Sequence, residues 1–381
     1  MSISFPVILG GIAVGVALAV IATALIWLYK HRLQNSGSKN SETGSSDPSA
    51  LGGRVSSVGG GRLVRDANEA RPRIFTIEEL EQATKKFDEC NLVGHGSFGL
   101  VYKGLLSDGT VVAIKRRVGS LQQELVKEVN YLSRISHRNL VSLIGYCQEG
   151  GFQMLIFEYL PNGSLSNHLY DTGQDSKIKL EFKQRLSVAI GAAKGLAHLH
   201  SLAPPLVHKN FKTSNVLVDE NFIAKVADAG IVRLVQSIED VGPSEASHQN
   251  IFRDPKIEDV RALSEASDVY SFGVFLLELV TGLSAAHMNF IDSNGSLIQW
   301  VKEHLNSGDL IDQRLAGSLT TEGMTALLRL TLRCLSLTGS RRPKIDAVGE
   351  ELHQILETEM TLTTIMGDGT AIVTLGSQLF A

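Results

Sequence analysis

The most informative stretch of this sequence reads Leu206-Val-His-Lys-Asn-Phe-Lys-Thr-Ser-Asn-Val-Leu-Val218, in which short apolar runs flank a polar loop. The loop holds two side-chain amides, at Asn210 and Asn215, and the amine of Lys212. An amide has no basic lone pair near neutral pH, so Asn210 can orient a hydroxyl group but cannot take its proton. What this loop can do therefore depends on the motifs around it.

Composition argues against two classes of protein. The chain has 381 residues, 43% of them hydrophobic, which is ample for a packed core in two domains or in one large two-lobed domain. Its formal net charge of −4 provides no basic field for nucleic acid. The three cysteines, Cys90, Cys147 and Cys334, are far apart, which favours reduced thiols in the cytosol over a disulfide framework.

Residues 6–29 form an uncharged, apolar segment. At about 1.5 Å per residue, a helix of this length is roughly 36 Å long, and a hydrocarbon core is about 30 Å thick. A cleaved signal peptide is the competing interpretation, but it needs a basic start, which residues 1–5 lack. Basic residues 30–32 follow, so the positive-inside rule predicts a single-pass membrane protein with an extracellular stub at 1–5 and a cytosolic remainder. The plasma membrane is the expected location.

Small residues follow one stripe of this predicted span, where Gly11, Gly15 and Ala19 recur at four-residue steps. Such stripes allow close approach of membrane helices, so a transmembrane homodimer or heterodimer is compatible with the sequence. Gly and Ala are nevertheless common in membrane helices of every kind.

Residues 30–73 are rich in Ser, Gly and Asn and are predicted to form a flexible linker. Its serines offer phosphorylation sites, but a solvated tether is the simpler interpretation. After the linker, Thr76 and Glu79 have the spacing of a helix-capping box.

A glycine-rich stretch reads Leu92-Val-Gly-His-Gly-Ser-Phe-Gly-Leu-Val-Tyr-Lys103 and contains the pattern G-x-G-x-x-G at Gly94, Gly96 and Gly99. A dinucleotide-binding fingerprint would pass from a strand into a helix, whereas here β-like residues follow, so a hairpin is predicted. Glycines at its tip let backbone amides approach phosphate oxygens.

Lys115 ends the apolar run Val111-Val-Ala-Ile114, and a buried ammonium group there needs an anion. The anion is expected from the next helix, which apolar residues at helical spacing predict over 121–136. Glu128 lies beside that apolar stripe and is the first candidate, and Glu124 is the second.

These motifs, in this order, resemble the plant receptor-like kinase family of the Ser/Thr protein kinases. Besides the glycine-rich stretch, the resemblance is carried by Val112-Ala-Ile-Lys115, His137-Arg-Asn-Leu-Val141, Phe157-Glu-Tyr-Leu-Pro-Asn-Gly-Ser-Leu165, His208 to Asn215, Asp228-Ala-Gly230 and Ser267-Asp-Val-Tyr-Ser-Phe-Gly273. It implies an α+β, two-lobed protein kinase fold preceded by a single transmembrane helix. The implied bounds are 74–358 for the kinase-like domain, 88–160 for a small β-rich N-lobe, 165–358 for a large helical C-lobe and 359–381 for a C-terminal tail.

The resemblance also implies a site for ATP and Mg²⁺. Lys115 would pair with two phosphates and with Glu128, and Asn215 and Asp228 would hold the metal. Lys212 matches the Ser/Thr-kinase form of the catalytic loop. The other nucleotide-binding residues implied are Val93, Gly94, Gly96, Ser97, Gly99, Val101, Ala113, Glu158 and Leu160.

Two departures from the family pattern lie at the reaction site. Asn210 stands where the family has the Asp that accepts the substrate proton. Ala229 stands where it has the Phe of Asp-Phe-Gly, so a void is expected beneath the helix that carries Glu128.

Two further departures lie in the segment that positions a protein substrate. His248-Gln249 replaces Gly-Thr, so the Thr that would contact the catalytic loop is absent. Lys256 replaces a Glu that pairs with an Arg, here assigned as Arg342, so Lys256 is expected to repel that guanidinium.

Two functions remain open. The first is a membrane-anchored, ATP-binding pseudokinase or scaffold that acts with active receptor-like kinases or other signalling proteins. The alternative is a weakly active Ser/Thr protein kinase, because positioning and charge neutralisation supply most of the catalysis of phosphoryl transfer. A ligand-binding receptor is disfavoured, since a stub at 1–5 cannot form a pocket.

Overall fold

The computed structural model describes residues 71–170, 180–238, 251–257, 262–288, 297–305 and 310–366. The predicted membrane span at 6–29 with its small-residue stripe, most of the predicted linker, and the substitution at His248-Gln249 lie outside the described residues. Within those described ranges, no helix is long and apolar enough to cross a membrane.

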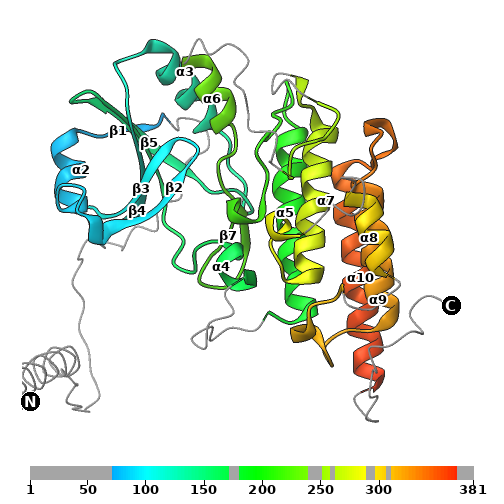
Figure 1. Ribbon diagram of the computed structural model, residues 1–381. Helices are drawn as coiled ribbons and strands as arrows, with labels where there is room; N and C mark the ends of the chain where they lie inside the picture. Colours follow the sequence, from blue (N-terminus) through cyan, green and yellow to red (C-terminus); the bar gives the residue numbers. More distant parts are fainter. Residues whose placement is uncertain are drawn as a thin grey trace, which may run out of the picture. The chain divides into compact units, whose positions relative to one another are not determined.

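The N-lobe contains a six-stranded sheet with the strand order β1-β5-β6-β4-β3-β2 (Figure 1). In β4, Val112 and Ile114 are fully buried and alternate with more exposed residues, because a strand turns every second side chain to the same face. Leu80 of the covering helix α2 (Ile77–Thr84) belongs to the same apolar cluster. The strands are β1 (Arg73–Ile74), β2 (Leu92–Gly96), β3 (Gly99–Leu105), β4 (Val111–Val118), β5 (Leu143–Glu149) and β6 (Phe152–Glu158).

Two short elements, β1 and α2 (Ile77–Thr84), precede residue 88, where the N-lobe was predicted to begin. Thr76 caps α2 as predicted, since its Oγ1 accepts a hydrogen bond from the backbone N–H of Glu79 at 3.2 Å. The other half of the capping box is absent, because the Glu79 carboxylate forms an ion pair with Arg73.

The helix predicted over 121–136 is observed as α3 (Gln123–Leu132). Its buried residues include Leu125, Val129 and Leu132, as the periodicity predicted. The predicted start was wrong, because Leu121 precedes the helix and is 76% exposed.

The described part of the C-lobe consists mainly of helices that pack on one another. The helix α5 contacts α7 and α10, and α9 contacts α7 and α10 (Figure 1). Almost all of α7 is buried, so its apolar sequence reflects a central position in the lobe. The helices are α4 (Leu165–Tyr170), α5 (Phe182–His200), α6 (Ile231–Ile238), α7 (Glu265–Thr281), α8 (Leu297–Leu305), α9 (Thr321–Cys334) and α10 (Ile345–Met366), and β7 (Val216–Val218) pairs with β8 (Ala224–Val226). Short 3₁₀ helices are η1 (Glu89–Asn91), η2 (Thr213–Asn215), η4 (Ala285–His287), η6 (Gln313–Leu315) and η7 (Gly339–Arg341).

Candidate nucleotide and catalytic site

The loop at 206–218 is held in place by α7. The carboxylate of Asp268 accepts hydrogen bonds from the backbone N–H groups of His208, at 2.7 Å, and Lys209, at 2.9 Å. Phe211 is 1% exposed and stacks on Phe272 with ring centroids 5.5 Å apart. A buried carboxylate that accepts two backbone donors, together with a buried aromatic pair, stabilises one conformation of this loop.

The two amides predicted to share this loop lie together. The Nδ2 of Asn215 donates a hydrogen bond to the backbone carbonyl of Asn210 at 2.9 Å. The backbone N–H of Asn210 donates to Nδ1 of His208 at 3.3 Å. Asn215 is buried, whereas Asn210 and Lys212 are half-buried and lie in the same loop.

Asp228 is buried, and both of its carboxylate oxygens have partners. Oδ1 forms an ion pair with the ammonium group of Lys115, and Oδ2 accepts a hydrogen bond from the hydroxyl group of Ser97 at 3.2 Å. The Lys115 side chain is only 12% exposed. The structure therefore brings together three residues predicted to bind nucleotide and metal, and it pairs them with one another.

Glu128 does not pair with Lys115, so that prediction was wrong. Its Oε1 lies 2.9 Å from Nε of Arg233, which belongs to α6. Burial raises the pKa of the Glu128 carboxyl group, and the charge of Arg233 opposes this rise. The physical reason for the exchange is that α6 packs on α3 and brings its own cation, while Lys115 is bound to Asp228. Glu124, the second candidate, is an exposed residue 3.9 Å from Lys127.

The helix that supplies Arg233 was not among the predicted elements. Apolar residues recur at helical spacing in Ile231-Val-Arg-Leu-Val-Gln-Ser-Ile238, and this signal would have found it. Leu234 is fully buried. Gly230, immediately before α6, has φ +77°, and a Cβ atom there would lie 2.3 Å from a Leu132 methyl group. The chain therefore approaches α3 more closely than a residue with a side chain would allow.

The remaining residues predicted to bind nucleotide lie on or beside the N-lobe sheet. Val101 pairs with Lys115 in the strand register, which places it on the same face as Ala113. The hairpin predicted for the glycine-rich stretch is confirmed, since Gly96 pairs with Gly99 across its tip. Gly94 and Val93 lie in β2, with Val93 51% exposed, while Glu158 ends β6 and the buried Leu160 follows it.

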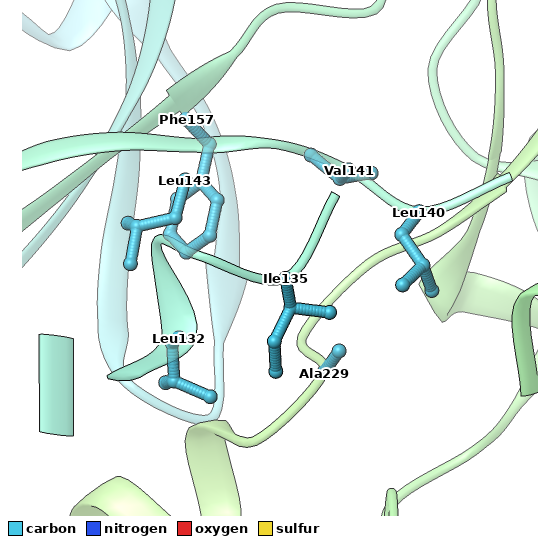
Figure 2. A pocket seen from close by; sticks show the side chains of 7 residues that line it. All are labelled: Leu132, Ile135, Leu140, Val141, Leu143, Phe157 and Ala229. Carbon is cyan, nitrogen blue, oxygen red and sulfur yellow. The ribbon is translucent and has the colours of Figure 1, made fainter. Parts of the chain in front are cut away.

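A small apolar cavity lies at Ala229, as the sequence predicted. Its volume is about 20 Å³. That is room for about one water molecule, and the side chains that line the cavity are all apolar. Figure 2 shows the lining side chains, which are Leu132, Ile135, Leu140, Val141, Leu143, Phe157 and Ala229.

Ala229→Phe is expected to destabilise the protein by about 1–3 kcal/mol, because a benzyl group is much larger than this cavity and overpacks it. Relief requires movement of Leu132 and Ile135, which belong to α3 and the turn after it. Urea unfolding of the Ala229→Phe and Ala229→Gly variants measures the effect. Greater stability of the Phe variant would contradict this packing.

The prediction that Lys256 repels Arg342 was also wrong. Nη1 of Arg342 forms a buried ion pair with Oδ2 of Asp254 at 2.5 Å. Lys256 is exposed, and its backbone N–H donates to Oδ1 of Asp254 at 3.2 Å. An acidic residue two positions earlier therefore neutralises the guanidinium.

Comparison with known proteins is consistent with this geometry. The family described as protein tyrosine and serine/threonine kinase matches residues 87–352. The proline-rich receptor-like protein kinase PERK3 of Arabidopsis thaliana is 39% identical over 285 residues, which cover 72% of this chain and 55% of PERK3. The receptor-like protein kinase ANXUR2 of Arabidopsis thaliana is 34% identical over 366 residues, which cover 92% of this chain and 42% of ANXUR2. The chain thus spans about half the length of these relatives.

A solved structure is similar as well. It is the pseudokinase domain of BIR2, an immune regulator of the RLK/Pelle family, with 29% sequence identity and a TM-score of 0.62. The match covers 78% of this chain and 92% of the BIR2 chain. With a β-sheet N-lobe, a helical C-lobe and the expected order of motifs, the chain belongs to the protein tyrosine and serine/threonine kinase family, and plant receptor-like kinases are among its relatives.

Proposed function

We propose that this chain is a membrane-anchored pseudokinase that binds ATP and Mg²⁺ and acts by binding active receptor-like kinases or other signalling proteins. The observation that carries the proposal is the catalytic loop, which is fully formed but has an amide, Asn210, at the position of the base. Because an amide cannot accept a proton, the loop lacks a general base, and general base catalysis typically contributes about 10²- to 10⁴-fold to the rate. Membrane anchoring rests on the uncharged segment at 6–29.

The ionic contacts of the cleft support the same function. Asp228 is bound to Lys115, and Glu128 is bound to Arg233. The cation proposed to bind phosphates, Lys115, and the carboxylate proposed to bind a metal ion, Asp228, therefore neutralise each other. Most of the catalysis of phosphoryl transfer comes from positioning the reacting groups and neutralising the phosphate charge. The residues that would do so are bound to one another in this arrangement.

The residues present fit magnesium and ATP once these contacts open. The carboxylate of Asp228 and the side-chain oxygen of Asn215 are ligands that magnesium prefers, and Lys115 provides a cation for the phosphates. Bound magnesium would neutralise phosphate charge. The protein's own part is to release Ser97 and Lys115 from Asp228, which frees the carboxylate and the ammonium group together.

The alternative function is a weakly active Ser/Thr protein kinase. The observation in its favour is that Lys115, Asn215 and Asp228 are all retained. The two functions differ in one measurable property, since the alternative requires transfer of the γ-phosphate to a protein by the unaltered chain.

Mg-ATP is expected to raise the melting temperature of the full chain, and Arg233→Ala is expected to tighten its binding by roughly fivefold. The Glu128–Arg233 ion pair stabilises the observed arrangement, in which Lys115 is bound to Asp228, by about 1 kcal/mol. Without this pair, the arrangement that can bind nucleotide is more populated. Ligand at 100 times its Kd stabilises by about 2.7 kcal/mol, a shift that differential scanning fluorimetry detects.

Two variants serve as controls for this measurement. Lys115→Met is expected to remove the nucleotide-dependent shift, and Arg329→Ala, an exposed arginine of α9, is expected to leave it unchanged. Absence of any shift at millimolar Mg-ATP, both in the unaltered chain and in Arg233→Ala, would show that the domain does not bind nucleotide.

A further inference from the structure

A second concave site lies on the N-lobe sheet, on the face opposite Lys115. The groove has a volume of about 320 Å³, and its lining residues come from β2, β3, β4 and β6. Leu100 pairs with Arg116, and Val118 pairs with Phe152, so these four side chains share one face. Lys115 is the neighbour of Arg116 in β4 and points to the other face.

The walls of this groove are apolar and open to solvent. Val118 is 78% exposed and Leu100 is 36% exposed, with the half-buried ring of Phe152 between the strands. Gly99 contributes no side chain, and a Cβ atom there would lie 2.2 Å from the carbonyl oxygen of Arg116. The hairpin backbone therefore packs directly on β4 at Gly99, beside these exposed aliphatic groups.

The floor of the groove carries the guanidinium group of Arg116, which forms no ion pair with an acidic side chain in the part of the chain that the structure describes. Arg116 lies between two aromatic rings, 3.7 Å from the centroid of Phe152 and 4.2 Å from that of Phe87. Its Nε is buried and has no hydrogen-bond partner among the residues that the structure describes. The rings cover the faces of the planar group, so a ligand can approach its N–H donors only within that plane.

The charges around the groove are of one sign. The exposed His95 joins Arg116 in its lining, Arg117 borders it from the other face of β4, and none of the described lining residues is acidic. An oriented, partly desolvated guanidinium binds a carboxylate more strongly than a fully exposed cation does. The complementary ligand is therefore an anion attached to an aliphatic chain.

We propose that this groove binds an acidic, aliphatic peptide segment of a partner protein. A Glu or Asp carboxylate of the segment accepts hydrogen bonds from Arg116, and a neighbouring aliphatic side chain packs between Leu100, Val118 and Phe152. An anionic membrane surface is the other anion to consider. A concave groove with a half-buried guanidinium suits one inserted side chain better than a flat sheet of headgroups.

Fluorescence anisotropy tests the proposal with the full chain in phosphatidylcholine nanodiscs. The probe is a fluorescein-labelled peptide of alternating Glu and Leu, and the matched peptide has Gln in place of Glu. We expect the acidic peptide to bind at least about tenfold more tightly than the Gln peptide, since a hydrogen bond between charged groups raises affinity by about that factor. Arg116→Gln is expected to lower the affinity of the chain for the acidic peptide by a similar factor.

Matched variants separate this site from loss of folding and from general charge attraction. Val118→Glu changes a largely exposed side chain, so it is expected to leave the melting temperature unaltered. It is expected to lower the affinity for the acidic peptide about fivefold or more. Arg341→Gln removes an exposed arginine elsewhere and is expected to change affinity by less than about twofold.

Three results would overturn the proposal. The first is equal affinity for the Glu and Gln peptides, or an equal loss in Arg116→Gln and Arg341→Gln. The second is loss of peptide binding when phosphatidylserine is added to the discs, which would assign the groove to the membrane surface. The third is self-association of the chain that Arg116→Gln abolishes, which would assign the groove to a second copy.

Discussion

Asn210→Asp alone is expected to raise phosphate transfer by less than about tenfold, although a general base typically contributes about 10²- to 10⁴-fold. The new carboxylate would lie in a formed loop, but the rest of the site is not arranged for transfer. Lys115 is bound to Asp228 and Glu128 to Arg233, so the cation expected to hold the phosphates and the carboxylate expected to hold a metal ion are both engaged elsewhere. A base gains little when the reacting groups are not held in place.

Asn210→Asp combined with Arg233→Ala and Ala229→Phe is expected to recover more activity than the three single changes multiplied together. Arg233→Ala releases Glu128, and the Phe ring favours an arrangement in which α3 has moved away from Ala229. Changes to groups that act as a unit are not additive, so the excess measures their coupling. Lys256→Glu is expected to add nothing, because Arg342 already has Asp254.

Radioactive phosphate transfer from ATP to a generic Ser/Thr substrate measures these effects, with Lys115→Met as the background. Each variant is tested as the full chain, and its melting temperature confirms that it is folded. Ordinary kinase activity in the unaltered chain, or in Asn210→Asp alone, would require the pseudokinase proposal to be abandoned.

Asp254→Ala is expected to lower the free energy of unfolding by about 3–5 kcal/mol, because it leaves a buried guanidinium group without a counter-charge. The Arg342 side chain is 0% exposed, and that of Asp254 is 5% exposed. Arg342 also donates to the carbonyl oxygens of Ser336, at 2.7 Å, and Ala266, at 2.8 Å. These bonds hold the guanidinium in place after the carboxylate is gone, so it cannot turn into solvent.

Denaturant unfolding of three further variants tests the assignment of this ion pair. Asp254→Leu with Arg342→Leu is expected to recover much of the loss, since replacing both members removes the unpaired charge. Lys256→Ala is expected to change stability by less than about 0.5 kcal/mol, because the side chain is exposed. A clear gain in stability from Lys256→Ala would show that Lys256 does repel Arg342, as inferred from sequence.

Local and periodic features of this protein were predictable from sequence. The glycine hairpin, the Thr76 cap and the buried helix α7 each depend on residues that are neighbours in the chain. The order of the motifs predicted a two-lobed α+β kinase fold, and the missing carboxylate at Asn210 is a property of the sequence itself.

Only the tertiary structure decided which charge each ionic group meets. Sequence assigned Glu128 to Lys115 and Lys256 to Arg342, whereas the structure pairs Glu128 with Arg233 and Arg342 with Asp254. Each observed pair joins segments that are remote in the chain, and its formation depends on how α6 packs on α3 and how 251–257 packs on the C-lobe. An ion pair forms where two side chains come within a few ångströms and are shielded from water, and no local pattern specifies either condition.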